Sequence, residues 1–127
     1  MILVDTSVWV AHLREGTPEL AAALEQGRVL THPFVVGELA CGNLKNRREV
    51  LQLLGDLPGV PMATDAEALD FIERRALMGR GIGYIDVHLL ASVVLSGSTQ
   101  MWTRDKRLAA VAEDLKLAYL EPAGRKS

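Results

Sequence analysis

Residues 1–14 read MILVDTSVWVAHLR, and this stretch decides the fold that we predict for the chain. Its first four residues are apolar and run directly into Asp5, which Thr6 and Ser7 follow. A continuous apolar run is typical of a parallel strand that is buried on both faces. Ligands in open parallel sheets bind beyond the carboxyl ends of the strands, so we expect Asp5 to face a polar crevice. Thr6 or Ser7 can then cap a helix over residues 8–13, although Asp5 itself is also a common helix-start residue.

Four further segments have the apolar character of short strands, and helical segments separate them. The predicted strands after the first cover residues 28–31, 60–63, 100–103 and 117–120. Helices are predicted over residues 18–26, 33–44, 45–54, 64–77, 84–95 and 106–114. Strands and helices that alternate in this way form right-handed crossovers and a parallel sheet with helices on both faces. We therefore expect an α/β fold, a three-layer α/β/α sandwich around a short-stranded, mainly parallel sheet of about five strands.

Three of these helices carry more specific predictions. The helix over residues 64–77 begins with a capping-box pattern, in which Glu67 follows Thr64 by three residues. Apolar residues at helical spacing are expected to form its buried face: Ala66, Leu69, Ile72, Ala76 and Leu77. The helices over residues 33–44 and 84–95 are apolar around nearly their whole circumference, which predicts that both are buried.

Length and composition limit the class of protein. A chain of 127 residues predicts one domain over residues 1–127, with residues 121–127 as a loose tail. Hydrophobic residues make up 49% and charged residues 24% of the chain, and no apolar run is long enough to span a membrane. We find no signal-peptide pattern, so we expect a cytoplasmic protein. The net charge of −2 argues against a strongly basic surface that binds nucleic acid everywhere.

Cysteine and histidine offer no recognisable chemistry here. Cys41 is the single cysteine, so we interpret it as a core residue. The histidines, His12, His32 and His88, have no metal-ligand spacing and no recognisable serine or cysteine partner. We expect them in the core or on the surface.

Four acidic residues point to a common site. Asp5 and Asp105 each follow a predicted strand, whereas Glu38 and Asp86 lie in the two helices predicted to be buried. Each has a simple alternative explanation, which is helix capping for Asp5 and Asp86 and solvent exposure at the edge of a packed face for Glu38.

Together these acids favour a metal site. Several carboxylates at one sheet edge repel one another unless a cation compensates their charge. Oxygen ligands favour a hard cation, Mg²⁺ with Mn²⁺ as a plausible substitute, and Mg²⁺ held by few carboxylates also binds substrate phosphates. The chemistry indicated is metal-assisted phosphodiester hydrolysis.

The chain also resembles the PIN-domain ribonucleases, and among them the VapC-type toxins of type II toxin–antitoxin pairs. The segments that carry this resemblance are VDTSV (residues 4–8), EL (38–39), GIGYIDVHLLAS (81–92) and WTRDKRL (102–108). They occur in the family's order and span nearly the whole chain. One departure is Leu108, where many members have an aromatic residue, and it concerns packing more than catalysis.

The resemblance implies a function and a set of site residues. It implies a PIN-like fold and a Mg²⁺-dependent endoribonuclease toxin, in which metal-activated water cuts RNA to leave a 5′-phosphate and a 3′-hydroxyl. A cognate antitoxin would occupy the acidic groove, and the toxin would be a homodimer. The family's metal-binding and catalytic acids correspond to Asp5, Glu38, Asp86 and Asp105, and its supporting polar residues to Ser7 and Thr103.

Basic residues beside the last acid are candidates for RNA contact. The first group is Arg104, Lys106 and Arg107, and the second is Lys45, Arg47 and Arg48. Such residues would position the RNA through its phosphates, whereas sequence choice needs contacts to bases.

Three alternative functions remain open. A PIN fold can bind RNA or protein without cutting it. A Mg²⁺-binding phospho-receiver domain could use Asp65 as its phosphate acceptor, but it needs a lysine after the fifth strand, where this chain has Glu121. A haloacid-dehalogenase-type phosphatase needs an aspartate two residues after Asp5, where this chain has Ser7.

Overall fold

The sheet has the N-terminal strand at its centre. The computed structural model describes residues 1–122, and in it β1 (Ile2–Val4) lies between β2 (Val29–Leu30) and β3 (Gln100–Trp102). Both pairings are parallel, with Leu3 opposite Leu30 on one side and Met101 on the other. The carboxyl ends of all three strands therefore lie at the same edge of the sheet.

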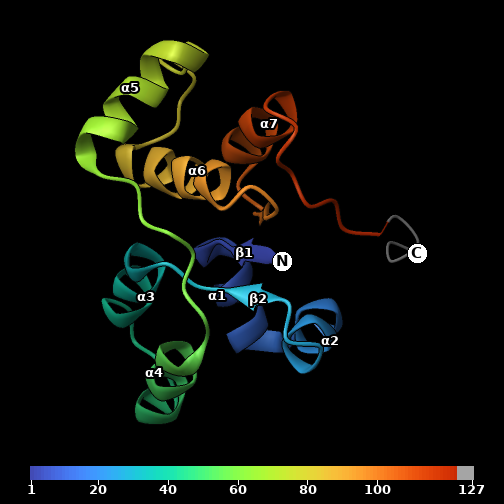
Figure 1. Cartoon of the computed structure of the whole chain (residues 1–127). Helices are drawn as coiled ribbons and strands as arrows, with labels where there is room; N and C mark the ends of the chain where they lie inside the picture. The colour runs from blue at the N-terminus through green and yellow to red at the C-terminus, as the bar shows by residue number, and fades with distance from the viewer. Residues whose placement is uncertain (123–127) are drawn as a thin grey trace.

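Helices cover both faces of this sheet. Figure 1 shows α5, α6 and α7 above the sheet and α1 to α4 below it, which confirms the predicted three-layer α/β/α sandwich. The helices are α1 (Thr6–Glu15), α2 (Pro18–Glu25), α3 (Pro33–Ala40), α4 (Arg47–Asp56), α5 (Asp65–Arg75), α6 (Tyr84–Ser96) and α7 (Lys106–Asp114).

The sheet is narrower than the five strands that we predicted. Within residues 1–122, the expected outer strands are single parallel bridges, Thr31 to Gly59 and Met101 to Ala118. These bridges lie at the two edges of the sheet, where the predicted outer strands would pair with β2 and β3. Pro58 precedes the first bridge on the side that faces β2, and a proline cannot donate the next ladder hydrogen bond there.

The core draws residues from all three strands and from helices on both faces of the sheet, and α6 contributes more of them than any other helix. All residues from Val87 to Val93 are buried, which confirms the predicted interior helix for its middle part. Its ends were predicted wrongly, because Tyr84, Ile85, Val94 and Leu95 are exposed. Trp9 and Trp102 are both fully buried. Cys41 is exposed, so its interpretation as a core residue was wrong, because α3 ends at Ala40 and the chain turns away from the packed face.

The capping box of α5 is confirmed, whereas its predicted buried face is confirmed only in part, by Leu77, which is buried, and Ile72, which is partly buried against the core. The Thr64 hydroxyl accepts a hydrogen bond from the Glu67 N–H at 3.0 Å, and Glu67 Oε1 accepts one from the Thr64 N–H at 2.8 Å. Ala68 and Phe71 are the buried residues of this helix, whereas Leu69 is 57% exposed. The apolar residues of α5 are spread around the helix, so their spacing alone did not identify the side that packs on α6.

The first residue of the predicted tail, Glu121, is held by a neighbour. Glu121 is half-buried, and its Oε2 accepts a hydrogen bond at 2.8 Å from the indole N–H of Trp102. Residues 123–127 of the predicted tail lie outside the described residues. Within residues 1–122, no helix is long and apolar enough to cross a membrane.

Candidate active site

Asp5 lies at the end of the central strand, as the sequence predicts. It is 6% exposed, and its Oδ2 accepts hydrogen bonds from the hydroxyls of Ser7 at 2.8 Å and Thr103 at 2.7 Å. Asp5 rather than Thr6 or Ser7 is the N-cap of α1, and it also accepts a longer hydrogen bond of 3.4 Å from the Ser7 N–H. The Asp5 carboxylate therefore caps α1 and also belongs to the candidate site, so the two explanations of this residue are compatible.

Ser7 and Thr103 join the ends of β1 and β3. Their hydroxyl oxygens lie 3.3 Å apart. Ser7 Oγ accepts the Arg104 N–H at 2.9 Å, and Thr103 Oγ1 accepts the Asp105 N–H at 3.0 Å. The two residues thus fix both the Asp5 carboxylate and the backbone that carries Asp105.

Three of the predicted acids stand at the starts of helices. Asp5 and Asp105 are the N-caps of α1 and α7, and Asp105 Oδ1 accepts the Leu108 N–H at 3.0 Å. Asp86 lies in the first turn of α6, where its Oδ2 accepts the Gly83 N–H at 3.3 Å. The N-terminus of a helix carries partial positive charge, which offsets some of the repulsion among carboxylates and attracts anionic ligands.

Glu38, the fourth predicted acid, lies on α3 and not at the start of a helix. Its side chain is exposed, so we were wrong to expect this helix to be buried all round. Glu38 Oε1 accepts a hydrogen bond from the Thr6 hydroxyl at 2.6 Å. Thr6 was not predicted to contact a site acid, because the two residues are 32 positions apart and no local pattern connects them.

Electrostatics connects all four acids. Burial raises the pKa of Asp86 above its usual value, and the negative charges of Asp5, Asp105 and Glu38 raise it further, against the opposing effect of the Gly83 N–H. The group defined by Asp5, Glu38, Asp86 and Asp105 is hereafter the acidic cluster.

The acidic cluster has carboxylate oxygens that could serve as metal ligands. Each carboxylate accepts its hydrogen bonds through one oxygen, and the other oxygen accepts none from residues 1–122. No ion pair within that part of the chain involves these acids.

A hard divalent cation fits this donor set. The ligands are all oxygens, and no cationic side chain of residues 1–122 forms an ion pair with them. Across residues 1–122, no three His, Cys, Asp or Glu side chains already form a group that could hold a metal ion. Binding would therefore have to draw the carboxylates together against their like charges.

The basic residues near Asp105 differ in their availability. Arg104 is held by Glu121 through two contacts, Nε to Oε2 at 2.9 Å and Nη2 to Oε1 at 3.2 Å. Lys106 and Arg107 are exposed and have no ion pair among the described residues. The stem of Arg107 lies against Gly81, where a Cβ would stand 2.7 Å from Arg107 Cδ.

The second basic group surrounds the start of α4. The Arg47 guanidinium donates to the carbonyl oxygens of Ala40 at 2.7 Å and Gly42 at 3.1 Å, so it closes the turn between α3 and α4. An open hollow of about 660 Å³ is lined by Arg47, Arg48, Leu51 and Gln52. Lys45 is exposed and precedes this helix.

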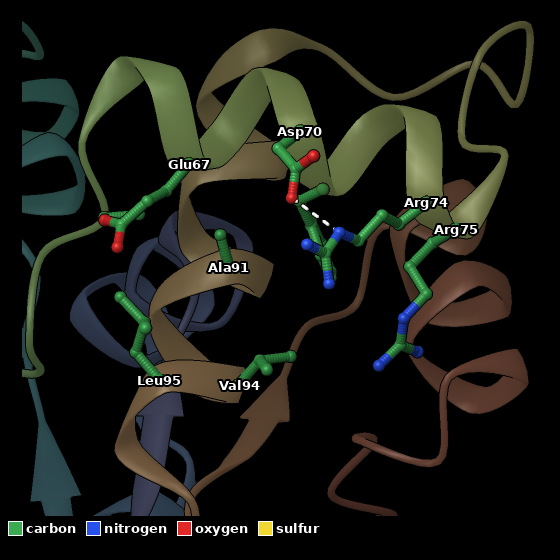
Figure 2. Close-up of a pocket in the computed structure, with 9 residues that line it drawn as sticks. Glu67, Asp70, Arg74, Arg75, Ala91, Val94 and Leu95 are labelled. Carbon is green, nitrogen blue, oxygen red and sulfur yellow. Dashed lines mark ion pairs between the residues drawn. The ribbon is translucent and has the colours of Figure 1, made fainter.

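A separate hollow lies between α5 and α6 (Figure 2). It measures about 270 Å³, and Phe71, Val94 and Leu95 are among the residues that line it. On α5, Asp70 forms an ion pair with Arg74 at 2.7 Å. No member of the acidic cluster lines this hollow, so it is not the candidate active site.

Comparisons with known proteins agree with the site. The model of the PIN domain family matches residues 2–114. The chain is 46% identical over 121 residues to Ribonuclease VapC32 of Mycobacterium tuberculosis (strain CDC 1551 / Oshkosh), which is 95% of this chain and 98% of the relative. The same identity and coverage hold for Ribonuclease VapC32 of strain ATCC 25618 / H37Rv. The chain therefore belongs to the PIN domain family, in the group that contains the VapC ribonucleases.

Proposed function

We propose that this chain is a metal-dependent endoribonuclease and the toxin of a toxin–antitoxin pair. The observation that carries the proposal is the acidic cluster, in which burial and the charges of the other three carboxylates raise the pKa of Asp86. The identity with Ribonuclease VapC32 supports RNA as the substrate.

Each member of the acidic cluster has a proposed role. Asp5, Glu38, Asp86 and Asp105 would hold Mg²⁺, with Mn²⁺ as a substitute, through the oxygens that accept no hydrogen bond from residues 1–122. A bound cation supplies positive charge that lowers the pKa of the attacking water and stabilises the leaving oxygen. Ser7 and Thr103 support the site by fixing the buried Asp5 carboxylate, so that little motion is needed during the reaction.

We propose Lys106 and Arg107 as RNA contacts ahead of Arg104. Glu121 holds the Arg104 guanidinium, so Arg104 would have to break two contacts before it could bind a phosphate. Lys106 and Arg107 need no such exchange. Arg48 on α4 and Lys45 before it are further candidates.

The finer features of the family are also proposals for this chain. We propose one cytoplasmic domain over residues 1–127, a homodimer, and a cognate antitoxin that covers the acidic cluster. The absence of any ion pair to these carboxylates within residues 1–122 supports a cationic antitoxin segment as the covering group.

The phospho-receiver alternative loses support. Asp65 Oδ1 accepts a hydrogen bond from the Tyr84 hydroxyl at 2.9 Å and lies 3.0 Å from His88 Nε2. These contacts lower the pKa of Asp65, first through Tyr84 and then through His88. Asp65 is thus held by neighbours outside the acidic cluster, and Glu121 binds Trp102 where a receiver needs a lysine.

The test is cleavage of a mixed RNA pool by purified protein. Wild type is assayed with Mg²⁺ and with chelator, and the variants Asp5→Asn and Asp70→Asn are assayed with Mg²⁺; sequencing identifies the product ends. We expect cuts that require Mg²⁺, disappear in Asp5→Asn and persist in Asp70→Asn, whose carboxylate pairs with Arg74 on α5. Full cleavage by a folded Asp5→Asn variant would contradict the proposal, whereas RNA binding without cleavage would indicate the non-cutting PIN module.

A further inference from the structure

We propose that Thr6 is a positioning residue for Glu38, a role that rests on the proposed nuclease function. Its hydroxyl donates to Glu38 Oε1 at 2.6 Å and connects the first residue of α1 with α3, 32 positions further along the chain. A hydrogen bond to an ionised carboxylate is shorter and stronger than one between neutral groups. Because Oε1 of Glu38 accepts this hydrogen bond, the other carboxylate oxygen is the one left to bind a cation.

Glu38 needs such a contact more than the other acids do. Asp5 is buried under two hydroxyls, and Asp86 and Asp105 each accept a backbone N–H of their own helix. Glu38 is an exposed, longer side chain near the C-terminal end of α3, where the helix dipole disfavours negative charge. Thr6 is its hydrogen-bond donor among residues 1–122, and no cation pairs with it there.

Repulsion also acts on Glu38. Its charge contributes to the raised pKa of Asp86, so the two carboxylates are close enough to repel. An untethered glutamate with several rotatable bonds would turn toward solvent and away from Asp86. The Thr6 hydroxyl opposes that rotation.

Thr6 is well placed for this task because its backbone is fixed and its hydroxyl is not required elsewhere. The preceding Asp5 N–H donates to the Trp102 carbonyl at 2.9 Å, which ties the start of α1 to β3. Asp5 provides the N-cap of α1, so the Thr6 hydroxyl has no capping role. Valine at this position keeps the branched shape of threonine and removes only the donor, whereas serine keeps the donor.

The experiment compares Thr6→Val, Thr6→Ser and a matched control, Thr17→Val. Thr17 is the N-cap residue of α2, and its side chain makes no capping hydrogen bond, so its hydroxyl serves neither the helix nor the acidic cluster. Mn²⁺ binding to the RNA-free protein is measured by calorimetry. We expect Thr6→Val to weaken Mn²⁺ binding about tenfold, as loss of an outer partner of a metal ligand does, and Thr6→Ser and Thr17→Val to bind as wild type.

A double mutant separates positioning from a general structural effect. In a Glu38→Ala background, Thr6→Val should cause no further loss of Mn²⁺ affinity, because the side chain that Thr6 positions is gone. Equal affinity of Thr6→Val and wild type, or losses that add in the double mutant, would overturn the proposal.

A second readout needs neither metal nor catalysis. Carbon-13 relaxation of the Glu38 methylene groups in metal-free protein should show faster motion in Thr6→Val and wild-type motion in Thr6→Ser. If wild type neither binds Mn²⁺ nor cuts RNA, the proposed function fails, and this relaxation measurement still decides the Thr6 contact. Unchanged Glu38 motion in Thr6→Val would overturn it.

Discussion

His32 shows how one buried imidazole makes the fold sensitive to acid. It is fully buried, and its Nδ1 accepts the Phe34 N–H at 3.0 Å as the N-cap of α3. Burial, and then the charge of His88, lower the pKa of His32 from 6.5 to about 4. The capping contact therefore requires the neutral ring.

The free energy of unfolding should fall as the pH drops from about 6.5 to 4. In that range the unfolded chain binds a proton at His32 that the folded chain does not, so stability is complete above the unfolded pKa and is lost toward the folded one. The contribution is at most about 3 kcal/mol. Urea unfolding of wild type and His32→Asn at pH 7 and 4.5 tests this, and an equal loss in both proteins would contradict it.

Glu121 should contribute to stability through Trp102. The indole N–H belongs to a fully buried ring, and without its acceptor it would be left unpaired. We expect Glu121→Ala to cost about 1–3 kcal/mol in urea unfolding, since a buried donor loses its partner. Glu25→Ala, an exposed change at the end of α2, is the control, and equal stability of the two variants would show that the indole N–H finds another partner.

At the scale of elements, the loop before α6 contacts the side chain of Arg107 through Gly81. Gly81 has φ +85°, a conformation that glycine adopts without strain, and its Cα faces the Arg107 stem. A side chain at Gly81 would push the Arg107 side chain away from this loop.

Gly81→Ala should therefore weaken RNA binding more than Gly79→Ala does. Gly79 also has positive φ, +73°, but has open space around a Cβ, so both variants carry backbone strain and only the first displaces Arg107. We expect each to lose about 1 kcal/mol of stability. RNA affinity, measured in an Asp5→Asn background, should fall only in Gly81→Ala, and equal affinities would remove Arg107 from the RNA surface.

The sequence identified most elements, and its errors have physical causes. The strand at β1 and the interior helix α6 were predicted because runs of apolar residues leave few alternatives. The predicted boundaries of α7, residues 106–114, are the observed ones, since Asp105 provides a clear start. The outer strands were wrong because each holds only one bridge, and an apolar tetrapeptide does not reveal how many ladder hydrogen bonds it makes.

At the scale of the whole molecule, the acidic cluster could be predicted only in part. Strand ends and helix starts locate Asp5, Asp86 and Asp105 from local pattern. The partner of Glu38 could not be found in this way, because the Thr6 contact depends on how α1 and α3 pack. The same holds for Arg104, whose availability depends on a residue 17 positions away.

Mg²⁺ should stabilise the whole fold. A cation that binds only the folded state adds about 2.7 kcal/mol when its concentration is 100 times its dissociation constant. The melting temperature of wild type and Asp70→Asn should rise with Mg²⁺, and that of Asp86→Asn should rise much less. An equal rise in all three proteins would indicate that Mg²⁺ acts elsewhere.

The hydrogen bond between Thr103 and Asp5 spans 98 positions, and this separation sets when the site can exist. A chain that is still being synthesised acquires Asp5 well before β3, Thr103 and Asp105. The acidic cluster therefore cannot assemble on a short nascent chain. If the chain cuts RNA as proposed, it gains that activity only after β3 and Asp105 have been made.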